Sequence, residues 1–440
     1  MNLARFDTPP EVANILCRHL PKTFKSILDP AVGAGTLLFP ALKMIAKQDC
    51  KVIAVDIDKT ALQQAKANLI SNVAIAPKFI CDEFVQWSMK KAVQRNLSNY
   101  FDCIVMNSPF LGRIKDWISL DLSHDSKQVT RKVPIEVAFL YRSLQFLKRG
   151  GRLLAVLPAS VISSQTNEWI RNELLINGSI EIVHELPRFS FPKVESRMYL
   201  FVYVKGCKKT HIELRNHDIT TPKKMILHKN DLDRRHRLDY SYYEVNQKYK
   251  SLIQSESLQW IKLSSVTDII RDRNRLKKDD VIHTWCYRDC RWYRPRKYRS
   301  MDKASGIPVR QGDILITRVG RKCSTTIGMI KKNASGCMMS DCVLAIRPKT
   351  PSDAMKLLFV LRSTFCNSNG ASLMERGSGA SYISAHDLGE LHIPWNLPEV
   401  YKRQYDSYRS AILAGDAVAM LAVEDEIKVK VWQPKRKYTC

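Results

Sequence analysis

Short apolar segments alternate with longer amphipathic stretches along the first 205 residues of the chain. The apolar segments have the length and composition of buried strands, and they cover residues 26–28, 51–55, 79–81, 102–106, 152–157 and 198–204. Strands that alternate with helices along a chain form parallel sheets with helices on both faces. The pattern therefore predicts an α/β domain of the doubly wound, Rossmann-like class.

Two of the strand-like segments, 181–186 and 198–204, have no helix-length stretch between them. Parallel neighbours need a long crossover, whereas antiparallel strands can be joined directly. We therefore expect these two segments to pair as an antiparallel hairpin at one edge of the sheet.

A polar, basic stretch over about residues 206–239 follows, and the pattern then changes. Beyond it the chain is richer in turns and short strands, and it ends in a helical stretch near 398–427 and a basic tail. We expect a first domain over residues 1–210, a second, mixed α/β domain over 230–430, and a tail over 431–440.

The formal net charge of +27 adds a strong constraint on the partner of the chain. An excess of this size indicates a polyanion, either nucleic acid or an anionic membrane surface. No apolar run approaches the roughly 20 residues of a membrane span, and the N-terminus lacks a secretory pattern. We expect a cytoplasmic protein without a membrane segment, and nucleic acid as its partner.

The 12 cysteines contain no Cys-x-x-Cys pair. Cys286 and Cys290 are the two cysteines whose spacing comes closest to that of a metal site. No second pair at zinc-finger spacing accompanies them. We therefore predict reduced thiols and no metal site.

A cofactor site is predicted where the first strand runs into a glycine turn and a helix, over residues 27–36. Asp29, Asp56 and Asp82 each stand at the end of one of three successive strands, the edge at which open α/β sheets bind ligands. Asp56 has the position of an acidic residue that binds ribose hydroxyls. The turn lacks both Gly-x-Gly-x-x-Gly and a Lys-Ser/Thr pair. Asp29 would repel a pyrophosphate, but it suits the cationic amino acid moiety of S-adenosylmethionine.

The fourth strand ends in Asn107-Ser108-Pro109-Phe110, which predicts the reacting centre. The N6 amino group of adenine is a poor nucleophile because its lone pair is delocalised into the ring. Two acceptors aimed at its N–H bonds, an Asn side-chain oxygen and a backbone carbonyl beside Pro, would localise that lone pair toward a methyl donor. The base must first leave the DNA helix, and an aromatic ring such as Phe110 can hold its face.

In this order the motifs resemble those of the γ-class N6-adenine DNA methyltransferases. The resemblance spans about residues 3–205, through the segments 5–12, 29–35, 56, 82, 107–110, 136–140 with 147–151, and 191–194. It implies that S-adenosylmethionine is bound by Thr8, Asp29, Ala31, Gly33, Gly35, Asp56, Ile57, Asp82 and Asn107. It implies catalysis by Asn107, Ser108, Pro109 and Phe110, with Phe110 and Phe191 stacking on the target base. Ser108 departs from the family, which usually has Pro there, although its carbonyl can still accept the second hydrogen bond.

The second half carries a basic region with interleaved aromatic residues over 271–299. Cations neutralise phosphates and aromatic rings stack on bases, so this pattern is typical of a DNA contact. Segments 311–320 with 340–346, 377–384 with 391–394, and Arg237-Leu238-Asp239-Tyr240 resemble the target-recognition domains of type I restriction specificity subunits. The predicted DNA-contacting residues are Arg271, Arg273, Arg275, Arg291, Arg294, Arg296, Lys297, Arg318 and Arg321.

Together these features predict a site-specific adenine-N6 DNA methyltransferase of a restriction–modification or related system, acting on double-stranded DNA. Other interpretations stay open: a methyltransferase on cytosine N4, on RNA or on a glutamine side chain, or a DNA-binding specificity component with an inert catalytic half. Glu426-Ile427-Lys428 has the Glu-x-Lys spacing of a nuclease but no preceding Pro-Asp. We therefore expect any endonuclease to be a separate protein.

Overall fold

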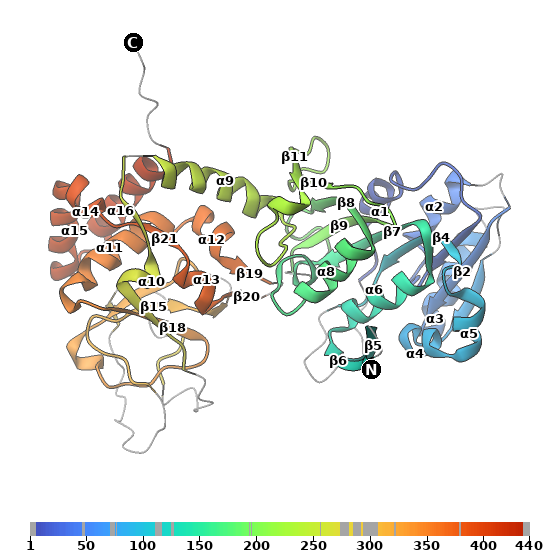
Figure 1. The fold of residues 1–440 in the computed structure, drawn as a ribbon, viewed down its shortest axis with the longest axis horizontal. Coiled ribbons are helices and arrows are strands. Elements are labelled where there is room, and N and C mark those ends of the chain that lie inside the picture. The colour runs from blue at the N-terminus through green and yellow to red at the C-terminus, as the bar shows by residue number, and fades with distance from the viewer. Residues whose placement is uncertain are drawn as a thin grey trace, which may run out of the picture. The chain divides into compact units, whose positions relative to one another are not determined.

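The computed structural model describes residues 6–45, 49–70, 75, 77–110, 117–124, 127–192, 194, 196–255, 257–272, 281–284, 292–293, 307–320, 323–377 and 380–433. The chain divides into two compact units (Figure 1). The first unit is Met1–Tyr240 with Gly377–Gly379, and the second unit is Ser241–Arg376 with Ala380–Cys440.

A large sheet forms the centre of the first unit. Its strands in the described part of the chain lie in the order β11-β10-β8-β9-β7-β4-β1-β2-β3. The central strands are β1 (Ser26–Asp29), β2 (Lys51–Asp56), β3 (Lys78–Cys81), β4 (Phe101–Asn107), β7 (Leu147–Pro158), β8 (Gly178–Glu185) and β9 (Met198–Lys205). Strands β3, β2, β1, β4 and β7 run parallel, and β9 is antiparallel to β7. The predicted α/β fold is confirmed.

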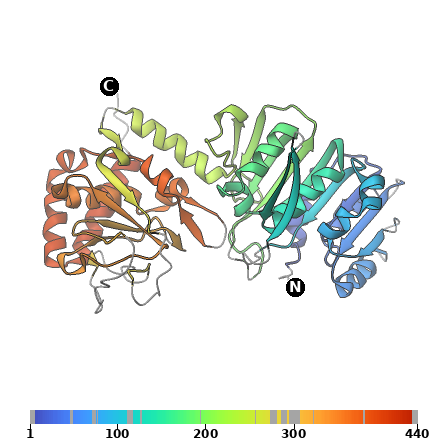
Figure 2. The same cartoon turned by 60° about the horizontal axis from the view of Figure 1, so that its bottom comes forward.

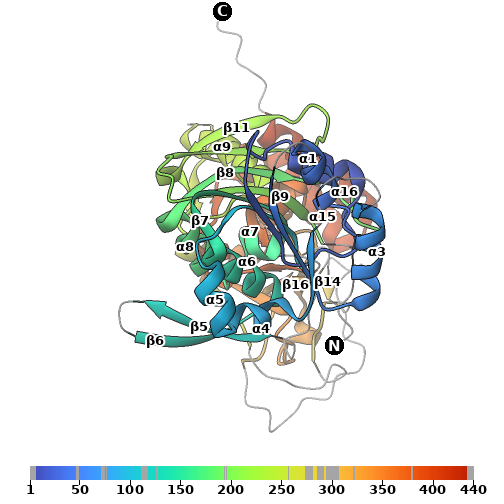
Figure 3. The same cartoon turned by 90° about the vertical axis from the view of Figure 1, so that its right-hand side faces the viewer.

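Helices cover both faces of this sheet, α1–α3 on one and α4–α6 with α8 on the other (Figure 3). They are α1 (Pro10–Cys17), α2 (Leu38–Met44), α3 (Lys59–Ile70), α4 (Phe84–Met89), α5 (Lys91–Leu97), α6 (Ile135–Phe146), α7 (Ala159–Ser163) and α8 (Glu168–Asn177). Because both faces are covered, the central strands are buried on both sides, and all four residues of β1 are buried, including the polar Ser26 and Asp29. Strands β5 (Ile118–His124) and β6 (Lys127–Val133) form a separate hairpin that projects from the unit (Figure 3).

The predicted hairpin of β8 and β9 is present, but its position at the edge of the sheet is wrong. β9 lies between β8 and β7, and two further strands continue the sheet beyond β8. These are β10 (His211–Arg215) and β11 (Lys224–His228), within the stretch that was expected to separate the domains. In β10, Ile212 and Leu214 are buried and their neighbours are polar. This short alternation of apolar and polar residues was the only sign of a strand in a basic segment.

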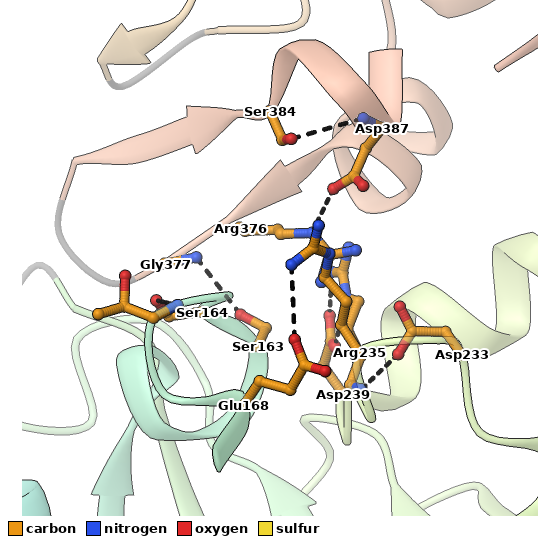
Figure 4. A network of polar contacts seen from close by, with 12 residues as sticks. Ser163, Ser164, Glu168, Asp233, Arg235, Asp239, Arg376, Gly377, Ser384 and Asp387 are labelled. Carbon is orange, nitrogen blue, oxygen red and sulfur yellow. Dashed lines mark hydrogen bonds and ion pairs between the residues drawn. The ribbon is translucent and has the colours of Figure 1, made fainter. Parts of the chain in front are cut away.

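The segment that was expected to open the second domain belongs to the first unit. Arg237 and Asp239 form an ion pair and are both almost fully buried. The backbone N–H of Arg237 also donates to the carboxylate of Asp233. Figure 4 shows this region, in which the Arg235 guanidinium donates to Glu168 and the N–H of Gly377 donates to Ser163. The Arg235 contact with Glu168, and the bond that the Arg171 guanidinium donates to the carbonyl of Arg235, hold residues 233–239 against α8.

The second unit is a mixed α/β structure with several small sheets. Its described strands form a five-stranded sheet, a three-stranded sheet and a pair. They are β13 (Thr267–Ile270), β18 (Val343–Pro348), β15 (Ile314–Thr317), β17 (Ile327–Ile330) and β14 (Trp292–Tyr293), then β16 (Val319–Gly320), β20 (Ser381–Ile383) and β19 (Glu375–Arg376), then β12 (Trp260–Lys262) and β21 (His392–Pro394).

Helices α11, α15 and α16 pack beside the sheets of the second unit and contribute to its main core together with strands β15, β17 and β18 (Figures 1 and 2). The helices are α9 (Tyr240–Gln254), α10 (Leu263–Val266), α11 (Ala354–Phe365), α12 (Ser368–Met374), α13 (Ala385–Gly389), α14 (Leu397–Val400), α15 (Lys402–Ala414) and α16 (Ala417–Trp432). Arg362 on α11 pairs with the fully buried Glu424 on α16, which also accepts from the Tyr408 hydroxyl. Among the described residues, no helix is both long and apolar enough to cross a membrane.

Candidate active site

A cleft opens in the first unit at the carboxyl ends of β1, β2 and β4. Its walls come from residues 6–8, 30–33, 36–37, 56–58, 82–84 and 107–110, and from Phe139 on α6. Most of the residues predicted as a site therefore line one cleft: Thr8, Ala31, Gly33, Asp56, Ile57, Asp82, Asn107, Ser108, Pro109 and Phe110. Asp29, Gly35 and Phe191 do not line it.

The turn between β1 and α2 depends on two glycines. Gly33 and Gly35 have φ angles of 55° and 83°, in the left-handed region that favours glycine. A Cβ on Gly33 would stand 3.0 Å from the Asp7 carboxylate, and one on Gly35 would stand 3.2 Å from Leu69. The two positions thus allow the N-terminal segment and α3 to approach the turn closely.

Asp29, the last residue of β1, lies directly beneath this turn and is 1% exposed. One carboxylate oxygen accepts from the N–H of Ala31 at 3.1 Å, and the other is buried without a partner among the described residues. Burial raises the pKa of Asp29 to about 8; the Asp56 charge adds to the increase and the Ala31 N–H opposes it. A buried carboxylate with one free oxygen has the chemistry of a site for an ammonium group.

The other two predicted carboxylates already have partners. Asp56 accepts from the N–H of Gly33 at 2.8 Å and from the N–H of Asp58 at 2.9 Å. Asp82 accepts from the N–H of Glu83 at 3.0 Å and forms an ion pair with Lys90. Lys90 had no signal in the sequence, because it reaches Asp82 only when α4 folds back over the end of β3.

Asn107, the last residue of β4, is held by the N-terminal segment. Its Nδ2 donates to the carbonyl of Phe6 at 2.9 Å and to the Thr8 hydroxyl at 3.0 Å. Both amide hydrogens are therefore engaged, and the orientation of the amide is set. The Oδ1 atom is buried without a partner among the described residues. The neighbouring Ser108 is 1% exposed, and its hydroxyl also lacks a partner.

The two predicted stacking residues differ in position. Phe110 lines the cleft, where its ring stacks on Phe6 and is only 3% exposed. Phe191 is 1% exposed and packs in the hydrophobic core of the first unit, which also contains Leu186 and Val194. The cleft has two further aromatic walls, Phe84 and Phe139. Phe139 lies in segment 136–140. The order of the motifs therefore indicated its helix, but not that its side chain faces the cleft.

Two of the predicted DNA-contacting residues are described, and both pair with one carboxylate. Arg271 reaches Asp341 at 2.8 Å, and Arg318 reaches it at 2.7 Å. Asp341 therefore neutralises part of their charge. Arg273, Arg275, Arg291, Arg294, Arg296, Lys297 and Arg321 lie outside the described residues.

Comparison with known proteins places this cleft in a family context. The family described as N-6 DNA Methylase matches residues 2–284. A ribosomal RNA small subunit methyltransferase C of Shewanella sediminis (strain HAW-EB3) is 30% identical over 141 residues, which are 32% of this chain. The matched part is 33% of that relative, so the chain spans about a third of its length.

Two solved structures of restriction enzymes match this chain. The type IIL restriction–modification enzyme MmeI in complex with DNA matches with a TM-score of 0.50 and 9% identity, over 93% of this chain and 69% of that one. The type IIG restriction endonuclease BpuSI matches with a TM-score of 0.48 and 13% identity, over 98% of this chain and 66% of that one. At these identities the likeness shows the fold alone.

Proposed function

Because the chain belongs to the N-6 DNA methylase family, whose methyl donor is S-adenosylmethionine, we propose that it methylates N6 of a flipped-out adenine within a specific DNA sequence. One observation carries the proposal. Asn107 Oδ1 is a buried acceptor with no partner in the described part of the chain, and it is held in place by two hydrogen bonds from the Nδ2 of the same amide.

The cleft fits S-adenosylmethionine, which supplies an electrophilic methyl group on a sulfonium. Asp29 lies beneath the turn and does not line the cleft itself; once a shift of the turn exposes it, its free oxygen would bind the ammonium group of the methionine moiety. Asp56 would accept from ribose hydroxyls, since each carboxylate oxygen has a further lone pair beside the backbone bond that it accepts. The half-exposed side chain of Ile57 and the ring of Phe139 would cover the apolar faces of the adenine moiety, with Asp82 at its edge.

Asn107 and Ser108 would activate the target amino group. Oδ1 of Asn107 accepts one N–H bond of the amine, and the backbone carbonyl of Ser108 accepts the other. Both bonds strengthen as positive charge develops on the nitrogen, so they stabilise the transition state more than the ground state. Because the Phe6 carbonyl and the Thr8 hydroxyl fix the amide, Oδ1 is already oriented when the base arrives, although the Phe6 ring must leave the face of Phe110.

The second unit would select the DNA sequence. Its segments resemble target-recognition domains, and the basic region over 271–299 lies within it. The net charge of +27 favours attachment to the phosphate backbone. The match to the N-6 DNA methylase family and the structural neighbour MmeI, a restriction–modification enzyme, support a place in a restriction–modification system. A separate endonuclease would be the partner.

A nucleoside assay tests the proposal. The purified protein is incubated with S-adenosylmethionine and unmethylated plasmid, and digested nucleosides are analysed by mass spectrometry. We expect N6-methyldeoxyadenosine from the wild type and from Asn96→Ala, a matched change on the exposed face of α5. We expect none from Asn107→Ala, although this variant should still bind S-adenosylmethionine. Full activity of Asn107→Ala would overturn the assigned role.

RNA methylation is the second candidate function, because the matched relative is named as a ribosomal RNA methyltransferase. The same assay on ribosomal RNA separates the two. Methylated ribonucleosides without a DNA product would favour RNA, and N4-methyldeoxycytidine would keep the DNA substrate but change the target base.

A further inference from the structure

The loop between β8 and β9 leaves the sheet at the same edge as Asn107. Asn107 pairs with Val156 near the end of β7, and Pro158 pairs with Met198 at the start of β9. Glu185 at the end of β8 pairs with Tyr199. Neighbouring strands lie roughly 4.8 Å apart, so the start of β9 is about 10 Å from the line of β4. Loop 186–197 therefore emerges beside the proposed reacting centre.

Apolar side chains anchor the base of this loop. Leu186, Phe191 and Val194 are each 1% exposed and belong to the same core cluster as Phe110. Phe191, for which stacking on the target base was predicted, is part of this buried anchor in the structure. A loop held at three points presents its tip in a defined position.

The tip is a tight turn over Pro187, Arg188, Phe189 and Ser190. The N–H and the hydroxyl of Ser190 both donate to the carbonyl of Pro187, at 3.2 and 2.7 Å. Phe189 is the third residue of this turn and has a φ of 66°, the left-handed conformation that turns usually assign to glycine. Non-glycine residues in this conformation are strained, and such strain is concentrated at functional sites.

Phe189 also exposes its ring. Its exposed fraction of 71% is the largest of any aromatic side chain in the described part of the chain. The adjacent Arg188 is exposed as well and forms no ion pair with a described residue. A flat apolar ring beside a free cation matches the chemistry of a nucleic acid, in which stacked bases lie next to phosphates.

We propose that Phe189 enters the DNA duplex at the target site and fills the space that the flipped base leaves, while Arg188 contacts an adjacent phosphate. The proposal rests on the proposed function, because it requires a base that leaves the helix. Flipping breaks the stacking and pairing of the target, and an inserted ring restores stacking with the neighbouring bases. The structure favours this role over stacking on the flipped base itself, since none of the described residues of loop 186–197 lines the cleft.

Substrates that differ only in target pairing test the proposal. The recognition site is first located by mapping methylated adenines in plasmid DNA. Wild type, Phe189→Ala and Phe189→Leu are then assayed on an intact duplex and on the same duplex with an abasic site opposite the target. The matched control is Ile176→Ala, an equally exposed apolar residue at the end of α8, at the opposite edge of the sheet.

On the intact duplex we expect kcat/KM of Phe189→Ala to fall about 5- to 150-fold, the range reported for an aromatic–base stacking contact. Phe189→Leu should lose less, and Ile176→Ala should equal the wild type. On the unpaired target, Phe189→Ala should regain wild-type activity, because the cost of unpairing is already removed. With 2-aminopurine at the target, its fluorescence on the intact duplex should be weaker with Phe189→Ala than with wild type.

An equal loss on paired and unpaired targets would overturn the proposal and indicate stacking on the flipped base. No loss on either substrate would overturn it as well. Phe189→Gly separates folding from function: glycine suits the left-handed turn, so this variant should melt no lower than wild type and still lose activity on the intact duplex. Failure of the wild type on every DNA substrate would instead contradict the proposed function.

Discussion

The rings of Phe6 and Phe110 stack in the cleft with their centroids 5.2 Å apart and their planes 22° apart. Phe110 is only 3% exposed as a result, so a target base can stack on it only after Phe6 has moved. Phe6 is also tied to the reacting centre, because its carbonyl accepts from Asn107. The N-terminal segment thus covers the site at which the base is proposed to bind.

Truncation of Phe6 and truncation of Phe110 should change the KM for DNA in opposite directions. We expect Phe6→Ala to lower the KM for DNA, because it removes a competitor for the face of Phe110. Phe110→Ala should raise the KM, because it removes the stacking partner of the base. Steady-state kinetics with a target-site duplex measure both. A higher KM in both variants would indicate that Phe6 is a second wall of the base site.

Thr8 orients the amide of Asn107, and its hydroxyl should affect turnover. Thr8→Val keeps the shape of the side chain but removes one of the two acceptors of Nδ2. A neutral hydrogen bond contributes about 0.5–1.5 kcal/mol, so kcat should fall roughly 2- to 13-fold with little change in KM for DNA. Thr23→Val, at an exposed position, is the control. An unchanged kcat would show that the Phe6 carbonyl alone is sufficient.

The free energy of unfolding should fall as the pH rises, because Asp29 is buried. Burial raises its pKa to about 8 in the folded protein, whereas the ordinary value is 3.8. Between these values the folded state holds a proton that the unfolded state releases, so stability falls with pH, by at most about 1.4 kcal/mol per pH unit. Asp29→Asn removes this dependence and should be more stable than wild type at pH 8.5, measured by thermal unfolding.

The same substitution should weaken cofactor binding. Asn cannot supply the negative charge that the ammonium group of S-adenosylmethionine requires, so calorimetry should detect little or no binding. In the wild type, affinity should increase from pH 6 to 7, because a growing fraction of Asp29 is ionised while the α-ammonium group of the cofactor, with a pKa of about 8, keeps its proton. Affinity that is independent of pH over this range would contradict Asp29 as the ammonium ligand.

Asp341 should restrain DNA binding by the second unit. It pairs with both Arg271 and Arg318, so Asp341→Asn should free their charge for phosphates. We expect tighter binding to a duplex without a recognition site and a steeper dependence of this affinity on salt concentration. Fluorescence anisotropy measures both. Asp406→Asn, on the exposed face of α15, gives the same charge change elsewhere. If both variants behave alike, the effect is one of net charge and not of these arginines.

Arg362 should be essential to the core of the second unit. It donates to both carboxylate oxygens of Glu424, a residue with no exposed surface. Arg362→Met leaves that carboxylate uncompensated and should cost about 3–5 kcal/mol of unfolding free energy, measured by urea titration. Arg362→Met combined with Glu424→Leu should recover much of the loss. No recovery would show that packing, not charge, is the main contribution.

The sequence by itself determined the features that depend on neighbouring residues. The order of strands and helices follows from apolar runs and turns, which act over a few positions. Asp29 and Asp56 end their strands and Asn107 ends β4, as their places in the sequence indicated. Because parallel strands bring their carboxyl ends to one edge, these residues meet in any sheet with this topology.

Only the tertiary structure decided which side chains are covered and which are free. Phe189 and Phe191 are two positions apart in one loop, yet one is exposed in a strained turn and the other is in the core. Phe6 on Phe110 and Asp341 between two arginines likewise require segments that are distant in the chain. Burial and pairing of this kind are set by packing across the whole unit, so no local pattern of residues can encode them.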